Sequence, residues 1–162
     1  MFDESIEVPV IGRVVGGHAG RIDDYKGGVE SIIRIVPAIP ESALQGIEEF
    51  SHLEVLWHFS LGSDNDIELE PRSPRDNPAW PATGGLVHRN HRRPARIGVS
   101  YPRLLRVEGR DLHVVDLDAD DGTPVIDLAP AFQEMLPRGP VRQPDWPTDM
   151  LRNYWQNAAE RP

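Results

Sequence analysis

The sequence has 162 residues, a formal net charge of -9 at pH 7 and no cysteine. This length suits one domain with its own hydrophobic core, and the absence of cysteine excludes disulfides, zinc fingers, iron–sulfur clusters and a thiolate nucleophile. The acidic balance argues against broad nucleic-acid binding through phosphate contacts. The lack of a long apolar run or a signal-like N-terminus predicts a cytoplasmic protein that does not enter a membrane.

The first half of the chain alternates strand-like runs with turns. β-branched and alternating apolar residues predict three strands, over residues 6–15, 29–36 and 52–60. The polar, glycine-rich residues 18–28 predict a loop between the first two strands. Apolar residues at helical spacing after Pro40 predict a short helix over residues 40–50.

The second half contains shorter elements. Residues 63–83 carry four prolines and predict a long loop, and residues 84–87 a short strand. The type of the segment 97–107 stays open between strand and helix, whereas residues 104–115 predict a hairpin that turns at Glu108-Gly109. Residues 125–128 predict a last short strand. The tail over 137–154 is broken by prolines and is expected to become helical from Pro147. Four of the tail's large side chains are expected to pack it against the body: Trp146, Met150, Tyr154 and Trp155.

Strands dominate this pattern, and strands and helices do not alternate regularly. The sequence therefore predicts a mainly β protein, with a β-barrel or a tightly curled sheet and one or two short helices, rather than a doubly wound fold.

A cluster of four arginines inverts the local charge: Arg89, Arg92, Arg93 and Arg96. We call residues 89–96 the arginine run. A guanidinium matches a carboxylate or a phosphate through two parallel hydrogen bonds and stays charged at working pH. The run therefore indicates an anionic ligand, or else a structural network with a second run of the opposite charge. The candidate partners in that network are Asp116, Asp118, Asp120 and Asp121.

Residues 121–124, which we call the acidic turn, have the composition of a tight turn. Asp121 tolerates turn geometry, Gly122 takes a positive φ, and Pro124 fixes the exit from Thr123. Such a turn presents backbone N–H and C=O groups that could contact the edge of an adenine. The same four residues also occur in turns that bind nothing.

The six histidines do not predict a metal site. His88 and His91 lie on no convincing helix, and His52 and His58 would be roughly 20 Å apart along one strand. No spaced set of carboxylates accompanies them, and the phosphate-loop, dinucleotide-binding and nucleophile-elbow motifs are missing.

Four segments together resemble the TsaA-like family, which includes the TrmO-type methyltransferases of threonylcarbamoyladenosine in tRNA. The family pattern Arg-Pro-Asn-Pro-Ile-Gly is similar to residues 93–98, and Leu-Asp-x-x-Asp-Gly-Thr-Pro-x-x-Asp to residues 117–127. Residues 48–53 and 11–14 match two further family segments. The resemblance extends over roughly residues 9–132.

This resemblance implies a single β-barrel domain over residues 1–136 with a C-terminal extension over 137–162 packed on it. It also implies S-adenosylmethionine as cofactor and a homodimer with the cofactor site near the subunit interface. The implied substrate is threonylcarbamoyladenosine in tRNA, which would be N-methylated. The implied cofactor-binding residues are Arg89, Arg93, Asp118, Asp121, Gly122, Thr123 and Pro124.

The catalytic candidates are Arg93, as a clamp for the carboxylate of the substrate, and His52, as a base or orienting group. A histidine at the start of a strand could instead simply bond to backbone. The sequence departs from the family at residues 23–28, 95–96 and 128–131, and it lacks the C-terminal domain of larger members. Two alternatives therefore stay open: a methyltransferase of a small carboxylate-bearing metabolite, and a non-catalytic module that binds S-adenosylmethionine.

Overall fold

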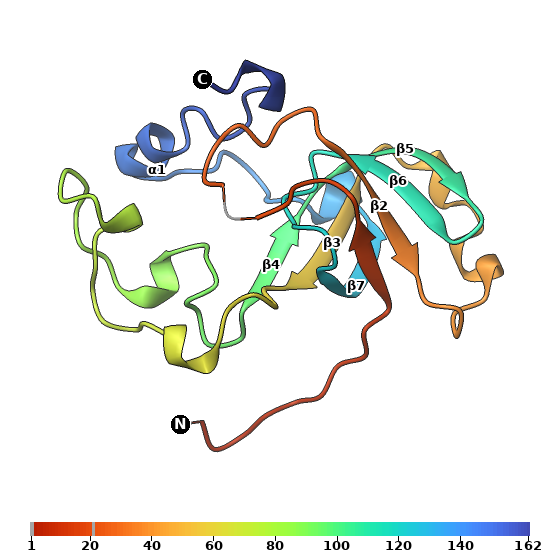
Figure 1. Ribbon diagram of the computed structural model, residues 1–162, viewed down its shortest axis with the longest axis horizontal. Coiled ribbons are helices and arrows are strands. Elements are labelled where there is room, and N and C mark those ends of the chain that lie inside the picture. Colours follow the sequence, from red (N-terminus) through yellow and green to blue (C-terminus); the bar gives the residue numbers. More distant parts are fainter. Residues whose placement is uncertain (1, 21) are drawn as a thin grey trace.

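The structure is a computed structural model that describes residues 2–20 and 22–162. Met1 and Arg21, which fall in the predicted N-terminal domain and in the predicted loop 18–28, lie outside the described residues. Seven strands form one antiparallel sheet in the order β4-β3-β7-β1-β2-β6-β5 (Figure 1). The strands are β1 Gly12–Val15, β2 Glu30–Ile35, β3 Leu53–His58, β4 Ile97–Ser100, β5 Arg103–Glu108, β6 Asp111–Val115 and β7 Pro124–Pro130.

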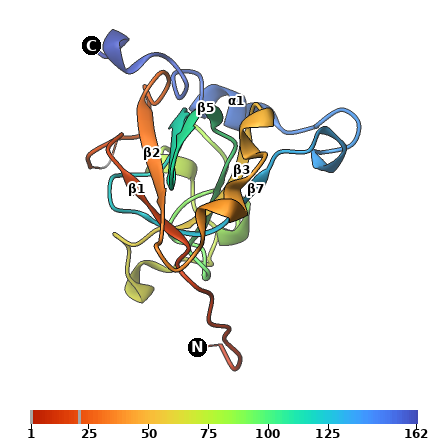
Figure 2. The same cartoon turned by 90° about the vertical axis from the view of Figure 1, so that its right-hand side faces the viewer.

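The prediction of a mainly β protein is confirmed, but the sheet does not close into a barrel. The sheet curls strongly (Figure 2) and leaves β4 and β5 as its two edges. Leu104 N donates to Ser51 O at 2.8 Å and Leu53 N to Pro102 O at 3.1 Å, so the start of β5 lies beside the start of β3. In the part of the chain that the structure describes, one isolated bridge, between His52 and Arg103, takes the place of a ladder there. Pro102 has no N–H to donate, and β4 turns directly into β5, so the contact does not extend.

The core lies inside the curl of the sheet. Strand β3 shows the predicted alternation, because Leu53, Val55 and Trp57 are buried while the residues between them are not. Alternate residues point to opposite faces of a strand, so one face of each strand supplies the core. Strands β1, β2, β6 and β7, the segment after β6 and the 3₁₀ turn before β3 contribute the remaining buried members: Val14, Ile33, Ile35, Leu112, Val114, Leu117, Ala119, Val125 and Ile47.

The first strand is shorter than predicted. It covers Gly12–Val15, and residues 6–10 run away from the body (Figure 1), whereas the backbone of Ile11 is still hydrogen-bonded to Val36 and Val125. Ile6 and Val8 are 83% and 51% exposed, so their β-branched side chains find no sheet to cover. Pro9 lacks the N–H that a central strand must donate, which explains why pairing begins only after it.

Two further predictions about local structure are wrong. The helix over 40–50 is a pair of 3₁₀ turns, Glu41–Leu44 and Ile47–Glu49, because Gly46 between them has φ 87° and interrupts the helix. The strand over 84–87 is a 3₁₀ turn, Gly85–Val87. A side chain at Gly85 would place Cβ 2.1 Å from the carbonyl oxygen of Glu68, so this turn is packed against the long loop and not paired in the sheet.

The other elements agree with the sequence. The strands predicted over 29–36 and 125–128 are β2 and β7. Residues 63–83 are a loop that contains the 3₁₀ turns Asp64–Asp66 and Pro74–Asp76. The open segment 97–107 divides into β4 and β5, and the β5–β6 hairpin turns at Gly109, where φ is 61°.

The C-terminal tail contacts the loop between β1 and β2. Its helix α1, Asp145–Met150, begins two residues before the predicted start. Further on, Lys26 N donates to Tyr154 O at 2.8 Å and Ala158 N to Gly27 O at 3.0 Å. Gly27 lies so close to the tail that a Cβ there would meet the Trp155 carbonyl oxygen at 2.1 Å. The division of the chain at residue 136 stays a prediction.

Candidate functional site

The acidic turn is held by backbone hydrogen bonds to the end of β1 and the residues after it. The N–H groups of Asp121 and Gly122 donate to the carbonyl oxygens of His18 and Val14, at 2.9 and 2.8 Å. The Asp121 carboxylate accepts from Gly16 N at 2.9 Å. Gly122 has φ 80°, and a Cβ there would find nothing within 4 Å, so the turn needs glycine for its backbone and leaves open space beside it.

These hydrogen bonds limit which groups of the turn are left to bind an adenine. The N–H of Thr123 is also used, since it donates to Asp120 O at 3.1 Å. With the N–H groups of Asp121, Gly122 and Thr123 all engaged, the backbone of the turn can offer carbonyl oxygens only, and those of Gly122 and Thr123 already accept from Arg13 Nη1 and Val14 N. An exocyclic amino group, which is a donor, fits such a surface, whereas a ring nitrogen that needs a donor does not.

Two members of the arginine run have local roles. Arg96 donates to Gly62 O at 2.7 Å and forms an ion pair with Asp64 at 2.9 Å, which ties the run to the start of the long loop. The backbone N–H of Arg92 donates to the side chain of Asn90 at 3.0 Å. Arg96 has φ 50°, so the chain turns sharply there before β4 begins.

Arg93 differs from these two. Its Nη2 donates to the carbonyl oxygen of Ile97, but its Nε is buried and has no hydrogen-bond partner within the described residues. Burial, and then the neighbouring positive charge of Arg89, lower the pKa of Arg93. Arg89 itself donates to Val99 O at 3.4 Å, a long bond. Two adjacent guanidiniums, one with an unsatisfied buried donor, form a site that an anion would satisfy.

Arg93 and the acidic turn lie at the same end of the sheet. Arg93 contacts Ile97, which pairs with His58, and the neighbour Trp57 pairs with Val125, one residue beyond the turn. The sheet therefore brings together two segments that are about 30 residues apart in the sequence. A ligand bound at this end of the sheet can contact both segments without a direct contact between the segments.

His52 lies away from this end. It precedes β3, where Leu53 pairs with Pro130, and β7 runs from there to Pro124, a separation of roughly 20 Å. Its ring is exposed, and Nδ1 lies 2.8 Å from the hydroxyl of its neighbour Ser51. The structure does not bring together the two residues predicted to be catalytic, His52 and Arg93.

His58 is the functional candidate that sequence reasoning missed. It ends β3 beside Ile97, and burial, followed by the charge of Arg96, lowers its pKa, while Asp64 opposes the shift. Its imidazole is therefore neutral at pH 7 and able to accept a proton. The sequence showed only a polar residue on the less buried face of a strand, and nothing in it placed His58 beside the arginine run.

Within the part of the chain that the structure describes, the acidic residues after β6 form no ion pair with the arginine run. Asp118 forms an ion pair with Lys26 at 2.9 Å and accepts a hydrogen bond from the Tyr154 hydroxyl. The carboxylate of Asp116 accepts from Gly28 N at 2.7 Å. Burial raises the pKa of Asp118, although Lys26 opposes this. The structural network between the two runs, which the sequence left open as an alternative, does not form among the described residues, and the cofactor contact predicted for Asp118 stays a prediction.

His18 should make the stability of the protein depend on pH. Burial, and then the charge of Lys26, lower the pKa of this histidine from 6.5, and its Nε2 is buried without a partner in the described chain. The unfolded chain therefore binds a proton that the folded chain resists. The free energy of unfolding should be highest above pH 6.5 and should decrease as the pH falls below it.

Urea unfolding at several values between about pH 5.5 and 7.5 measures this dependence. The variant His18→Gln should show a shallower decrease, although His58 leaves a residual slope of the same sign. An unchanged slope in the variant would contradict the role of His18. The raised pKa of Asp118 acts in the opposite direction.

In the described parts of the chain, no three His, Cys, Asp or Glu side chains come together as they would to hold a metal ion. Within the same residues, no helix has the length and apolar character needed to span a membrane.

The structure is thus a mainly β protein with one curled antiparallel sheet, which carries an arginine pair and a glycine turn at one end. Residues 18–135 match the family described as tRNA-methyltransferase O N-terminal domain, and the chain belongs to this family. The crystal structure of TrmO from Pseudomonas aeruginosa has the same fold, with a TM-score of 0.69 and 22% identity over 87% of this chain and 61% of that one.

Relatives with related names are similar in sequence. A probable S-adenosyl-L-methionine-binding protein of Pyrococcus abyssi is 33% identical over 87% of this chain and 67% of its own length. A second protein of that description, from Methanothermobacter thermautotrophicus, is 33% identical over 83% of this chain and 96% of its own. The tRNA (adenine(37)-N6)-methyltransferase of Mus musculus is 37% identical over 56% of this chain, which spans only 21% of that enzyme.

Proposed function

We propose that the chain binds S-adenosylmethionine at the end of the sheet that holds the acidic turn and Arg93, and transfers the methyl group to N6 of an adenosine in tRNA. The finer form of the proposal is that this adenosine carries a threonylcarbamoyl group. The names of the relatives from Pyrococcus abyssi and Mus musculus support the cofactor and the nucleoside, respectively.

The observation that carries the proposal is the unsatisfied Nε of Arg93 beside Arg89. A buried donor without a partner is costly, and a carboxylate would satisfy it with a charge-assisted hydrogen bond. Both the amino-acid part of S-adenosylmethionine and the threonylcarbamoyl group carry a carboxylate. The acceptors of the acidic turn fit the exocyclic amino group of an adenine, so the donors and acceptors present fit the cofactor.

The bound cofactor would supply an electrophilic methyl group attached to a sulfonium. Most of the acceleration of such a transfer comes from holding the nucleophilic nitrogen in line with that methyl group. Arg93 and Arg89 would bind and orient the carboxylate of the substrate. The nitrogen must also lose a proton, and His58, which is neutral and close to the arginine run, is the acceptor that this end of the sheet offers in place of His52.

A second candidate substrate is a small metabolite with a carboxylate. The net charge of -9 favours it, because an acidic protein attracts an RNA backbone poorly. The proposal also includes a cytoplasmic homodimer, for which light scattering at tens of micromolar is the test, and a monomer would refute that part.

Two measurements test the function. Isothermal titration should give binding of S-adenosylmethionine to the purified protein, and a folded protein that releases no heat at high micromolar cofactor would overturn the cofactor assignment. Mass spectrometry of tRNA from a deletion strain should show loss of methylated threonylcarbamoyladenosine. An unchanged peak, together with cofactor binding, would point to the metabolite.

A further inference from the structure

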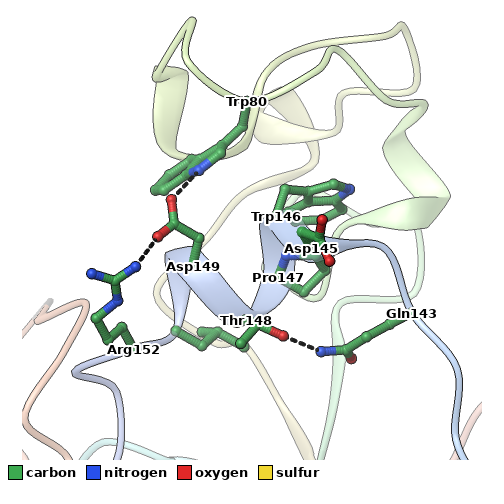
Figure 3. Close-up of a pocket in the computed structure, with 9 residues that line it drawn as sticks. Trp80, Gln143, Asp145, Trp146, Pro147, Thr148, Asp149 and Arg152 are labelled. Carbon is green, nitrogen blue, oxygen red and sulfur yellow. Dashed lines mark hydrogen bonds and ion pairs between the residues drawn. The ribbon is translucent and has the colours of Figure 1, made fainter.

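A groove of about 890 Å³ lies between the long loop and helix α1 (Figure 3). We call it the tryptophan groove, because Trp80 from the loop and Trp146 from the helix both line it. Its volume falls in the range of small-molecule sites. The other lining residues are Gln143, Asp145, Pro147, Thr148, Asp149, Leu151 and Arg152.

The indole of Trp80 is fixed in place. Its Nε1 donates to the Asp149 carboxylate at 3.0 Å, and Arg152 forms an ion pair with the same carboxylate (Figure 3). These two contacts use both oxygens of Asp149 and largely neutralise its charge. The ring therefore offers a face whose orientation is set before any ligand binds, which lowers the entropy lost on binding.

Trp146 connects the groove to the candidate site. Its ring lies 6.4 Å, centre to centre, from that of His88, which is buried and directly precedes Arg89. The groove therefore backs onto the start of the arginine run. Helix α1 lies beyond residue 135, where the match to the family ends, so this wall of the groove comes from outside the matched domain.

We propose that the tryptophan groove binds an unpaired nucleobase of the RNA, next to the nucleotide that enters the candidate site. The inference rests on the proposed function and names how the RNA would be held. Aromatic side chains bind single-stranded RNA by stacking on unpaired bases, and every base has a flat face that an indole can cover.

The polar groups around the groove suit the same ligand. Arg152 has a side chain that is 73% exposed and can reach a phosphate as well as Asp149. Asp145 is exposed and makes no ion pair within the described residues, so its carboxylate is an acceptor. A carboxylate accepts from the amino group of adenine, cytosine or guanine, and uracil has no such group. Binding through one stacked base also agrees with a chain too acidic to follow a long phosphate backbone.

The test uses an RNA hairpin of about 17 nucleotides with an unmodified seven-base loop, so that binding is measured apart from methyl transfer. Titration followed by tryptophan fluorescence should show quenching, and Trp146→Ala should weaken the affinity by about 10-fold or more. Trp155→Ala is the matched control, because Trp155 is 52% exposed and packs on Tyr154 outside the groove. Its affinity for the hairpin should equal that of the unchanged protein.

Two further binding comparisons identify the ligand. The hairpin should bind more tightly than adenosine monophosphate alone, whereas equal affinity would make the groove a nucleotide site and overturn the RNA assignment. A loop of uridines should bind more weakly than a loop with adenines and cytosines, and Asp145→Asn should reduce that difference. This variant keeps the inference testable if Trp146→Ala fails to fold. Equal affinities for the two loops would contradict the role of Asp145.

The outcomes separate this inference from the proposed function. If Trp146→Ala and Trp155→Ala bind the hairpin alike, while the unchanged protein methylates tRNA, the groove assignment fails and the function stands. If Trp146→Ala loses the hairpin and the unchanged protein methylates no tRNA, the groove assignment stands and the function fails.

Discussion

Replacing Arg93 by alanine should weaken cofactor or substrate binding, or slow methyl transfer, by roughly 10- to 100-fold. Arg93 has a buried Nε without a hydrogen-bond partner among the described residues, and burial and then the charge of Arg89 lower the pKa of this side chain. The variant would lose a charge-assisted hydrogen bond to a carboxylate in a partly desolvated site, which is worth about 1.5–3 kcal/mol. Affinity by titration and methyl transfer by mass spectrometry are the measurements.

The neighbouring arginines supply the controls. Arg92→Ala should change affinity and rate little. Arg96→Ala should act on the long loop instead, because this side chain is bonded to Gly62 and to the exposed Asp64, and an exposed ion pair contributes only about 0–1 kcal/mol. Both variants should melt close to the unchanged protein. Equal, small effects at Arg89, Arg92, Arg93 and Arg96 would mean that the run is a solvated surface.

Replacing Gly98 by alanine should destabilise the fold by about 1–3 kcal/mol through overpacking. A Cβ at this position would lie 2.4 Å from ring atoms of Trp57, far inside van der Waals contact. The indole of Trp57 is buried and donates to the Ser100 hydroxyl at 3.0 Å. A displaced indole would lose that bond too, at a cost of about 1 kcal/mol.

Thermal melting should show the effect as a decrease of roughly 2–4 °C for each kcal/mol lost. Gly84→Ala is the control, because a Cβ at Gly84 would meet nothing within 4 Å and its φ of -59° suits alanine. A melting temperature that falls equally in both variants would contradict the steric explanation. The Gly98 variant should also lose activity only in proportion to the folded fraction, because the glycine itself contacts no ligand in the proposal.

Much of the sheet could be predicted from local sequence. The alternation of Leu53, Val55 and Trp57 is a direct consequence of side chains that point to opposite faces of a strand, and it placed β3 and its buried face correctly. The turn at Gly109 also followed from the sequence, because glycine takes a positive φ at little cost. Local rules failed where a neighbouring strand was missing, as in residues 6–10, which are exposed and lie outside the sheet.

The candidate site, too, was only partly predictable from the sequence. Residue type alone determined that the arginine run could bind an anion and that Gly122 would sit in a tight turn, because charge and conformational freedom belong to the side chain itself. The tertiary structure decided which arginine has an unsatisfied donor. The pairing of β3 with β4 and β7 decided that His58, and not His52, lies at the end of the sheet that holds the arginine run. Such pairing joins residues far apart in the chain, so burial, desolvation and the contacts of Arg93 were decided only by the tertiary structure.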